Sequence, residues 1–239
     1  MWGQGVAHCT EKVGTGAIAK EILVACGGKK ALLLGETHQN PPSQNLFLSL
    51  VDVQVSQGKR VFVGLEISGG QQGNLDALLA DPKAAGGNIT LYHALDHRAY
   101  REMLAQLGAY ARAGVDVRAI DATDEDNDRD ATMSRNVAAA VRSGEYDVVL
   151  VLVGNLHTIK RMKWHPDSGA TSRYLAERLV GGGIDVCSVM QRFAGQESGP
   201  VVTSGCSTEK NVLAMDIIRN TYHAEDMTGD GVADVVVGW

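Results

Sequence analysis

Two continuous apolar runs, each ending in a glycine that a histidine closely follows, constrain the fold of this 239-residue chain most strongly. The first run, at 31–34, leads to His38, and the second, at 148–153, leads to His157. Apolar runs without polar alternation are typical of strands that are buried on both faces of a parallel sheet. Each run therefore predicts a buried strand that carries a histidine just beyond its carboxyl end.

Strand and helix patterns alternate along the rest of the chain. Further strands are predicted at 60–67, 115–121, 184–190 and 233–238, and helices at 15–25, 41–56, 100–113, 130–142, 171–179 and 209–220. This alternation is typical of an α/β fold with a mostly parallel sheet, helices on both faces and right-handed crossovers. The stretch 69–113 is too long for a plain connection, so we expect a helical insertion or lid after the second strand. The length suits a single α/β domain over 1–239.

Composition narrows the range of partners. The net charge is −6 and the pI about 5.6, so the chain offers no basic surface for nucleic acid. No apolar run reaches the roughly 18 residues that a membrane span requires. We therefore expect a small-molecule or peptide substrate, with neither nucleic acid nor a membrane span involved.

The four cysteines bear on the compartment. Their even number permits two bridges, Cys9–Cys26 and Cys187–Cys206, which would fit a periplasmic or extracellular setting. The alternative is four buried thiols in a cytosolic protein. The first residues lack the basic and apolar regions of a secretory signal, which fits either a cytosolic start or a start after a removed signal.

Ionisable side chains lie where four successive predicted strands end. Glu36 and His38 follow the first strand, Glu66 the second, Asp121 the third and His157 the fourth. Because the carboxyl ends of parallel strands meet at one edge of a sheet, we expect these groups to form one site. Two chemistries fit the set. His38, His157, Glu36 and Glu66 could bind a divalent metal that activates water, or one histidine, oriented by a glutamate, could act as the general base without a metal.

These motifs, in this order, resemble those of a known superfamily. The resemblance lies in Gly35-Glu36-Thr37-His38, Leu65-Glu66, Arg129-Asp130-x-x-Met133 and Gly154-Asn155-Leu156-His157. The superfamily includes the ChaN haem-uptake proteins, the erythromycin esterases and the TraB/Tiki proteins, and the run Gln39-Asn40-Pro41 with Gln44 is most similar to the ChaN branch. The resemblance implies an α/β fold whose two histidine motifs line one pocket.

The resemblance implies two functions, and the hydrolase is our leading hypothesis. An enzyme of the erythromycin esterase/Tiki type would cleave an ester or peptide with His38, His157, Glu36 and Glu66 as its catalytic residues. The alternative is a binding protein for haem or another metal-porphyrin. ChaN-like proteins bind haem through a tyrosine, for which Tyr92, Tyr100 and Tyr110 are the candidates.

One arginine joins the expected site through the same resemblance. Arg135-Asn136 resembles an arginine–asparagine pair of the TraB/Tiki branch, so Arg135 is expected to hold a substrate anion or to position a site glutamate. Arg129, at the start of the same predicted helix, is interpreted as a solvated residue with local ion pairs.

A second metal site is predicted near the end of the chain. Oxygen-bearing side chains recur with the spacing of a calcium loop, at Asp226, Thr228, Asp230 and Asp234. Bound calcium would hold this segment and favour an extracellular setting. The alternative is a polar turn before the last strand, where aspartate and glycine are common.

Overall fold

The computed structural model describes residues 14–81, 88–123, 128–162, 174–193, 200–205, 208–222 and 231–239. Within them a seven-stranded sheet has the order β3-β2-β4-β1-β5-β7-β6, and only β6 runs antiparallel to its neighbour, β7. The strands are β1 (Ala31–Glu36), β2 (Val61–Ser68), β3 (Asp116–Asp121), β4 (Val148–Gly154), β5 (Val186–Arg192), β6 (Val201–Ser204) and β7 (Val235–Gly238).

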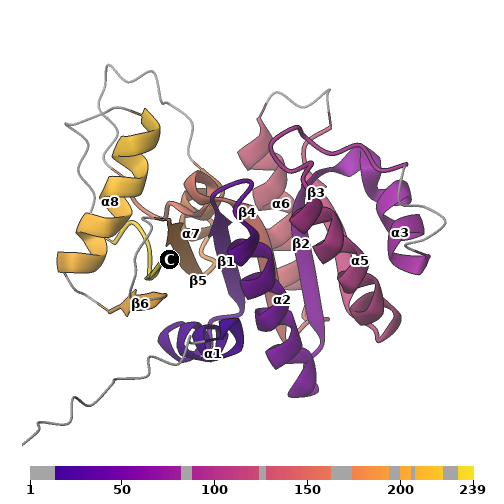
Figure 1. The fold of residues 1–239 in the computed structure, drawn as a ribbon, viewed down its shortest axis with the longest axis horizontal. Coiled ribbons are helices and arrows are strands. Elements are labelled where there is room, and N and C mark those ends of the chain that lie inside the picture. The colour runs from indigo at the N-terminus through magenta and orange to yellow at the C-terminus, as the bar shows by residue number, and fades with distance from the viewer. Residues whose placement is uncertain are drawn as a thin grey trace, which may run out of the picture.

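Helices cover both faces of the sheet (Figure 1). They are α1 (Thr15–Ala25), α2 (Pro41–Ser56), α3 (Gln72–Ala80), α5 (Arg98–Arg112), α6 (Arg129–Ser143), α7 (Leu175–Gly181) and α8 (Thr208–Tyr222), with short 3-10 turns η1 (Gly69–Gln71) and η2 (Asn155–Thr158). The α/β class and the mostly parallel sheet are thus as the sequence predicts. The four-residue β6 was expected to be loop, because its partly exposed residues give no buried apolar run.

The core lies in layers on the two sides of the sheet, which explains the continuous apolar strands. In β1, Leu32 and Leu34 pack with α1, α2 and α5 on one side, whereas Ala31 and Leu33 pack with α6 and α7 on the other. Every residue of β1 and β4 is buried. Because successive side chains of a strand point to opposite faces, a strand covered on both sides must be apolar throughout.

The segment 69–113 contains η1, α3 and α5. Helix α3 packs against α5, and α5 in turn packs against α2, beside the sheet. Two tyrosines of the segment, Tyr92 and Tyr100, reach the neighbourhood of the strand-end carboxylates. The interpretation of 69–113 as an insertion or lid stays a prediction. Among the helices that the structure describes, none is long and apolar enough to cross a membrane.

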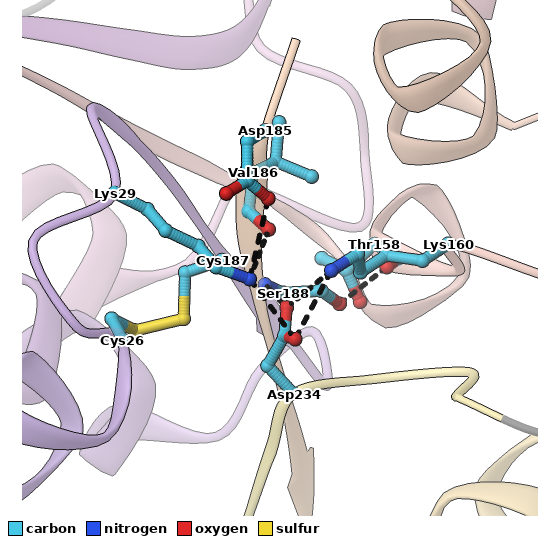
Figure 2. Close-up of a disulfide and its surroundings, with 9 residues drawn as sticks. All are labelled: Cys26, Lys29, Thr158, Lys160, Asp185, Val186, Cys187, Ser188 and Asp234. Carbon is cyan, nitrogen blue, oxygen red and sulfur yellow. Dashed lines mark hydrogen bonds and ion pairs between the residues drawn. A yellow bond between two sulfur atoms is a disulfide. The ribbon is translucent and has the colours of Figure 1, made fainter. Parts of the chain in front are cut away.

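A disulfide between Cys26 and Cys187 connects the end of α1 to β5 (Figure 2). Neither of the two pairings that the even count permits, Cys9–Cys26 and Cys187–Cys206, is therefore formed, and the alternative of four thiols does not hold either. Cys26 and Cys187 are both buried in the layer between α1 and the sheet, with Cα atoms 5.4 Å apart, although 161 residues separate them in the chain. Spacing along a sequence carries no information about such a long-range pairing. Cys9 and Cys206 lie outside the described residues.

Asp234 lies in an ion-pair network close to this disulfide (Figure 2). Its Oδ1 accepts hydrogen bonds from Lys29 Nζ at 3.3 Å and Lys160 Nζ at 3.0 Å, and its Oδ2 from the backbone N–H of Ser188 at 2.8 Å. A calcium ion would have to compete with these two ammonium groups for the carboxylate. The other predicted calcium ligands, Asp226, Thr228 and Asp230, lie outside the described residues, so the calcium loop stays a prediction.

Candidate functional site

The predicted strand-end residues meet at one edge of the sheet. Glu36, the last residue of β1, lies opposite Gly154, the last residue of β4, in the parallel register of the two strands. His38 and His157 follow directly after these positions. They line a common cleft of about 350 Å³, whose described walls are formed by Glu36, Thr37, His38, Gly154, Asn155, Leu156, His157, Gln191, Arg192, Phe193 and Ile217.

Glu36 and His38 form a hydrogen-bonded pair at the end of β1. Glu36 is 2% exposed, and its Oε1 lies 2.9 Å from His38 Nδ1 while its Oε2 accepts a hydrogen bond from Gln44 on α2. The carboxylate therefore favours the proton on Nδ1 and leaves Nε2 as the basic nitrogen. The hydrogen bond to Glu36 raises the pKa of His38, and burial of the ring opposes this only in part.

The Nε2 atom of His38 faces the end of β4. It would lie 3.3 Å from a Cβ atom placed on Gly154, so a glycine at this position leaves room for the imidazole. In the described part of the chain, Nε2 has no hydrogen-bond partner. The His38 side chain is 34% exposed, so this nitrogen is available to a water or ligand in the cleft.

Glu66, the second strand-end carboxylate, is held by groups from three segments. Its Oε2 accepts a hydrogen bond of 2.7 Å from the backbone N–H of Gly154, while its Oε1 lies 2.8 Å from Arg129 and 3.4 Å from His157 Nε2. Burial alone would raise the pKa of Glu66. The hydrogen bonds and charges of its partners, His157 first, outweigh burial and lower this pKa to about 2. Glu66 is therefore a carboxylate at neutral pH.

His157 is fixed between two carboxylates. Its Nδ1 lies 2.7 Å from Asp130 Oδ1, opposite the contact that Nε2 makes with Glu66, and Asp130 also accepts a hydrogen bond from the backbone N–H of Leu175. Burial lowers the pKa of His157, but Asp130 and Glu66 outweigh it and raise the pKa to about 10. His157 therefore carries a positive charge at neutral pH and cannot serve as a base.

Arg129 is 44% exposed, as expected of a solvated residue, but its ion pairs are with two buried strand-end carboxylates rather than with neighbours on its own helix. Its Nε lies 3.1 and 3.0 Å from the two oxygens of Asp121, and its guanidinium also binds Glu66 and lies over the ring of Tyr92. Arg135, which the sequence predicts in the site, is exposed and donates to Thr132 on its own helix. The sequence signal that could have identified Arg129 is its place in the first turn of α6, just beyond the carboxyl end of β3.

The residues of this site do not fit a bound divalent metal. Both oxygens of Glu36 and both of Glu66 accept hydrogen bonds, and both nitrogens of His157 face carboxylates. A metal at Glu66 would also lie beside the positive charge of Arg129. Of the candidate donors, only His38 Nε2 is uncommitted, and the described residues contain no group of three or more His, Cys, Asp or Glu placed to hold a metal.

The pKa of each of the three tyrosines named for haem is raised above its usual value, so none ionises easily, although Tyr92 is 37% exposed. Tyr100 is fully buried, and burial raises its pKa well above 10. Burial and the neighbouring Asp121 also raise the pKa of Tyr92, whose ring is engaged by a guanidinium. Tyr110 donates its hydroxyl proton to Asp52 at 3.0 Å. Haem binding therefore has no identified ligand among these residues.

The turn η2 is packed directly against β1, which the sequence does not reveal. A Cβ atom on Gly35 would lie 2.5 Å from Asn155 Oδ1 and 2.8 Å from its Cα, so only glycine fits. The Asn155 side chain donates to Thr37 and to the backbone carbonyl of Gln191, while Gln191 N–H donates back to it at 2.9 Å. Asn155 thus joins the ends of β1, β4 and β5 around the cleft.

Comparison with known proteins identifies the fold. No family model matches the sequence, and no curated protein matches it. Among solved structures, erythromycin esterase EreC matches with a TM-score of 0.60 at 12% identity, covering 92% of each chain. A Bacillus cereus protein matches with a TM-score of 0.59 at 12% identity, covering 97% of this chain and 93% of its own. Campylobacter jejuni ChaN, a structure with cofacial haem, matches with a TM-score of 0.50 at 11% identity, covering 91% and 90%. The resemblance indicated by the motifs is confirmed at the level of the fold.

Proposed function

We propose that this protein, which shares its fold with erythromycin esterase EreC and with ChaN, is a hydrolase that cleaves an ester with His38 as general base. The observation that carries the proposal is the Glu36–His38 pair, in which a buried carboxylate binds Nδ1 and leaves Nε2 facing the cleft. This is the arrangement by which a carboxylate orients an imidazole and increases its basicity in general-base catalysis. No metal takes part in the proposed reaction.

In the proposed reaction, His38 Nε2 accepts a proton from a water molecule while the water oxygen bonds to the ester carbonyl carbon. The tetrahedral intermediate then collapses, the bond to the alcohol oxygen breaks, and His38 returns the proton to that oxygen. The products are a carboxylic acid and an alcohol. His157 lines the same cleft with both ring nitrogens held by Asp130 and Glu66, so it does not take the proton.

An ester fits this site better than a peptide. An alcohol leaves as an oxyanion with little assistance, whereas the amine of a peptide must first be protonated. His38 is the histidine in the described walls of the cleft that keeps an uncommitted ring nitrogen, since His157 is held by Asp130 and Glu66. Of the two substrate classes, ester and peptide, we therefore favour the ester.

The test is turnover of ester and peptide panels by His38→Ala and Glu36→Gln, with His93→Ala as the matched control on an exposed histidine. We expect ester turnover to fall about 100- to 10,000-fold in His38→Ala, the usual contribution of a general base, and to persist in the control and in chelator. Wild-type turnover in His38→Ala would overturn the proposal. Loss of activity in chelator, restored by a divalent metal, would replace it with the metal mechanism. A Soret band on adding haemin would support the ChaN-type alternative.

We further propose an oxidising compartment, periplasmic or extracellular, for the mature protein. The support is the Cys26–Cys187 disulfide, since such bridges persist mainly outside the reducing cytosol. Alkylation with and without a reductant, read by mass spectrometry, is the measurement. Cys26 and Cys187 found as free thiols in protein isolated from its native host would contradict the proposal.

A further inference from the structure

The cleft has two unlike walls, and the proposed reaction uses only one of them. The reactive wall carries the Glu36–His38 pair and His157. The other wall is formed by Arg192 and Phe193 at the end of β5 and by Ile217 on α8. We call this second wall, made of Arg192, Phe193 and Ile217, the β5 wall. This wall combines one cation with apolar side chains, and none of them activates water in the proposed reaction. We therefore ask which ligand these side chains would bind.

The charge of Arg192 is only weakly compensated. Its nearest described carboxylate is Asp216 on α8, at 3.8 Å, which is longer than a hydrogen bond. In the described part of the chain, its guanidinium donates no hydrogen bond. Arg129 gives the contrast in the same region, because its guanidinium is bound by both Asp121 and Glu66. The Arg192 side chain is 32% exposed and lines the cleft, where its guanidinium can bind an anion.

In the apolar part of the β5 wall, Phe193 packs against Trp239. The ring of Phe193 stacks on that of Trp239, with centroids 5.9 Å apart and planes 6° from parallel. Trp239 is held in turn, because its Nε1 donates to Gln191 Oε1 at 2.8 Å and its backbone N–H donates to the carbonyl of Arg192 at 2.9 Å. An aromatic ring fixed in this way loses little conformational freedom when an apolar group packs on it.

The β5 wall is also fixed relative to the reactive wall. The same Gln191 that binds Trp239 donates its Nε2 to the carbonyl oxygen of Gly35 at 2.6 Å, one residue before Glu36. A chain of hydrogen bonds therefore runs from Trp239 through Gln191 to the strand end that bears the base. A substrate that contacts Phe193 and Arg192 would thus be placed at a set position relative to His38.

We propose that the substrate is an acidic ester, with a carboxylate that Arg192 binds and an apolar or aromatic part that packs on Phe193. This inference rests on the proposed hydrolase function and narrows its substrate class. Arg192 and Phe193 determine specificity, while the bond broken is the ester bond at His38. Asp216 competes with the substrate for Arg192, so it moderates the affinity.

The experiment compares two aryl esters that differ only at the end of the acyl chain. Mono-4-nitrophenyl succinate carries a carboxylate where 4-nitrophenyl butyrate carries a methyl group. In Arg192→Gln we expect the KM for the succinate to rise about tenfold relative to the KM for the butyrate. This is the effect expected when one partly exposed hydrogen bond between a guanidinium and a carboxylate is lost. Arg192→Lys should recover part of the difference, Asp216→Asn should lower the KM for the succinate, and Arg98→Gln, on an exposed helix face, should change neither.

Binding without turnover separates this inference from the proposed reaction. The probes are 4-phenylbutyrate and the neutral 4-phenylbutyramide, titrated by calorimetry into the wild type, His38→Ala, Arg192→Gln and Phe193→Ala. We expect the carboxylate to bind more tightly than the amide, and both Arg192→Gln and Phe193→Ala to weaken it while His38→Ala does not. Melting temperatures of the variants show whether each is folded.

The outcomes are distinguishable. Binding of the carboxylate through Arg192, with neither ester turned over, would support the β5 wall and overturn the hydrolase. Turnover of both esters with equal KM, and equal binding of both probes in wild type and Arg192→Gln, would overturn the β5 wall as an anion site and leave the hydrolase standing. The absence of both binding and turnover would overturn both.

Discussion

Replacing Glu66 by glutamine removes one charge from the site and keeps the shape of the side chain. Glu66 is 5% exposed, and burial alone would raise its pKa, but His157, the Gly154 backbone and Arg129 lower it from 4.5 to about 2. At about 1.4 kcal/mol for each pH unit, this lowering corresponds to about 3 kcal/mol of folding stability. Because the pKa is lower in the folded protein than in the unfolded chain, the contribution is complete above about pH 4.5 and is lost as the pH falls toward 2.

The assay is urea unfolding, followed by circular dichroism, of wild type and Glu66→Gln at several pH values between 3 and 7. We expect the variant to be less stable by about 3 kcal/mol at pH 6.5 and the two free energies of unfolding to converge as the pH falls. The matched control is Glu102→Gln on α5, an exposed carboxylate paired with Arg98, which should show little difference at any pH. A difference that stayed constant down to pH 3 would refute the reasoning, because an uncharged packing defect does not titrate.

The same variant tests the charge of His157 independently. With Glu66 neutral, Asp130 remains as the carboxylate beside the ring, so the pKa of His157 should fall below its value of about 10 in the wild type. Histidine resonances followed by NMR across the pH range measure this directly. An unchanged His157 titration would show that Glu66 does not hold the ring in its charged form.

Three further predictions test the pair at β1, its glycine and the disulfide. In Glu36→Gln, the pKa of His38, which the carboxylate raises, should fall, so the acidic limb of ester turnover, where protonation of His38 stops the reaction, should move to lower pH; a pH profile of kcat/KM checks this, and an unmoved limb would separate Glu36 from the base. Gly35→Ala should destabilise the protein by about 1–3 kcal/mol, since its Cβ meets backbone at 2.8 Å, and unchanged urea unfolding would contradict the close contact. Reduction of Cys26–Cys187, which closes a separation of 161 residues, should lower stability by about 2–5 kcal/mol; equal unfolding midpoints with and without reductant would exclude the bridge.

Much of the fold could be predicted because local sequence determines it. The strands β1 and β4 are apolar at every position since both faces are buried, and that pattern is visible without any tertiary information. The edge strand β6 is short and partly exposed, so no such pattern marks it. The disulfide forms because the end of α1 lies beside β5 in the folded chain. The spacing of cysteines along the sequence does not predict this long-range contact.

The candidate site, like the fold, has a part that local sequence predicts and a part that depends on long-range packing. Strand ends predict that Glu36, His38, Glu66 and His157 come together, because parallel strands present their carboxyl ends at one edge. The roles of these groups depend on distances that only the folded chain sets. The position of Asp130 at 2.7 Å makes His157 a cation rather than a base, and the reach of Arg129 makes it the site arginine in place of Arg135.

The strand order has a consequence for how the proposed hydrolase would change over evolution. The strands β3, β2, β4 and β1 form one continuous half of the sheet, and the strand-end residues Glu36, Glu66 and Asp121, with His38 and His157 just beyond, belong to this half. The strands β5, β7 and β6 form the other half, and the end of β5 together with α8 provides the β5 wall of the cleft. Under the proposed function, substitutions in the second half that spare Gln191, which hydrogen-bonds to Gly35, would change the compounds bound and leave the Glu36–His38 pair in place.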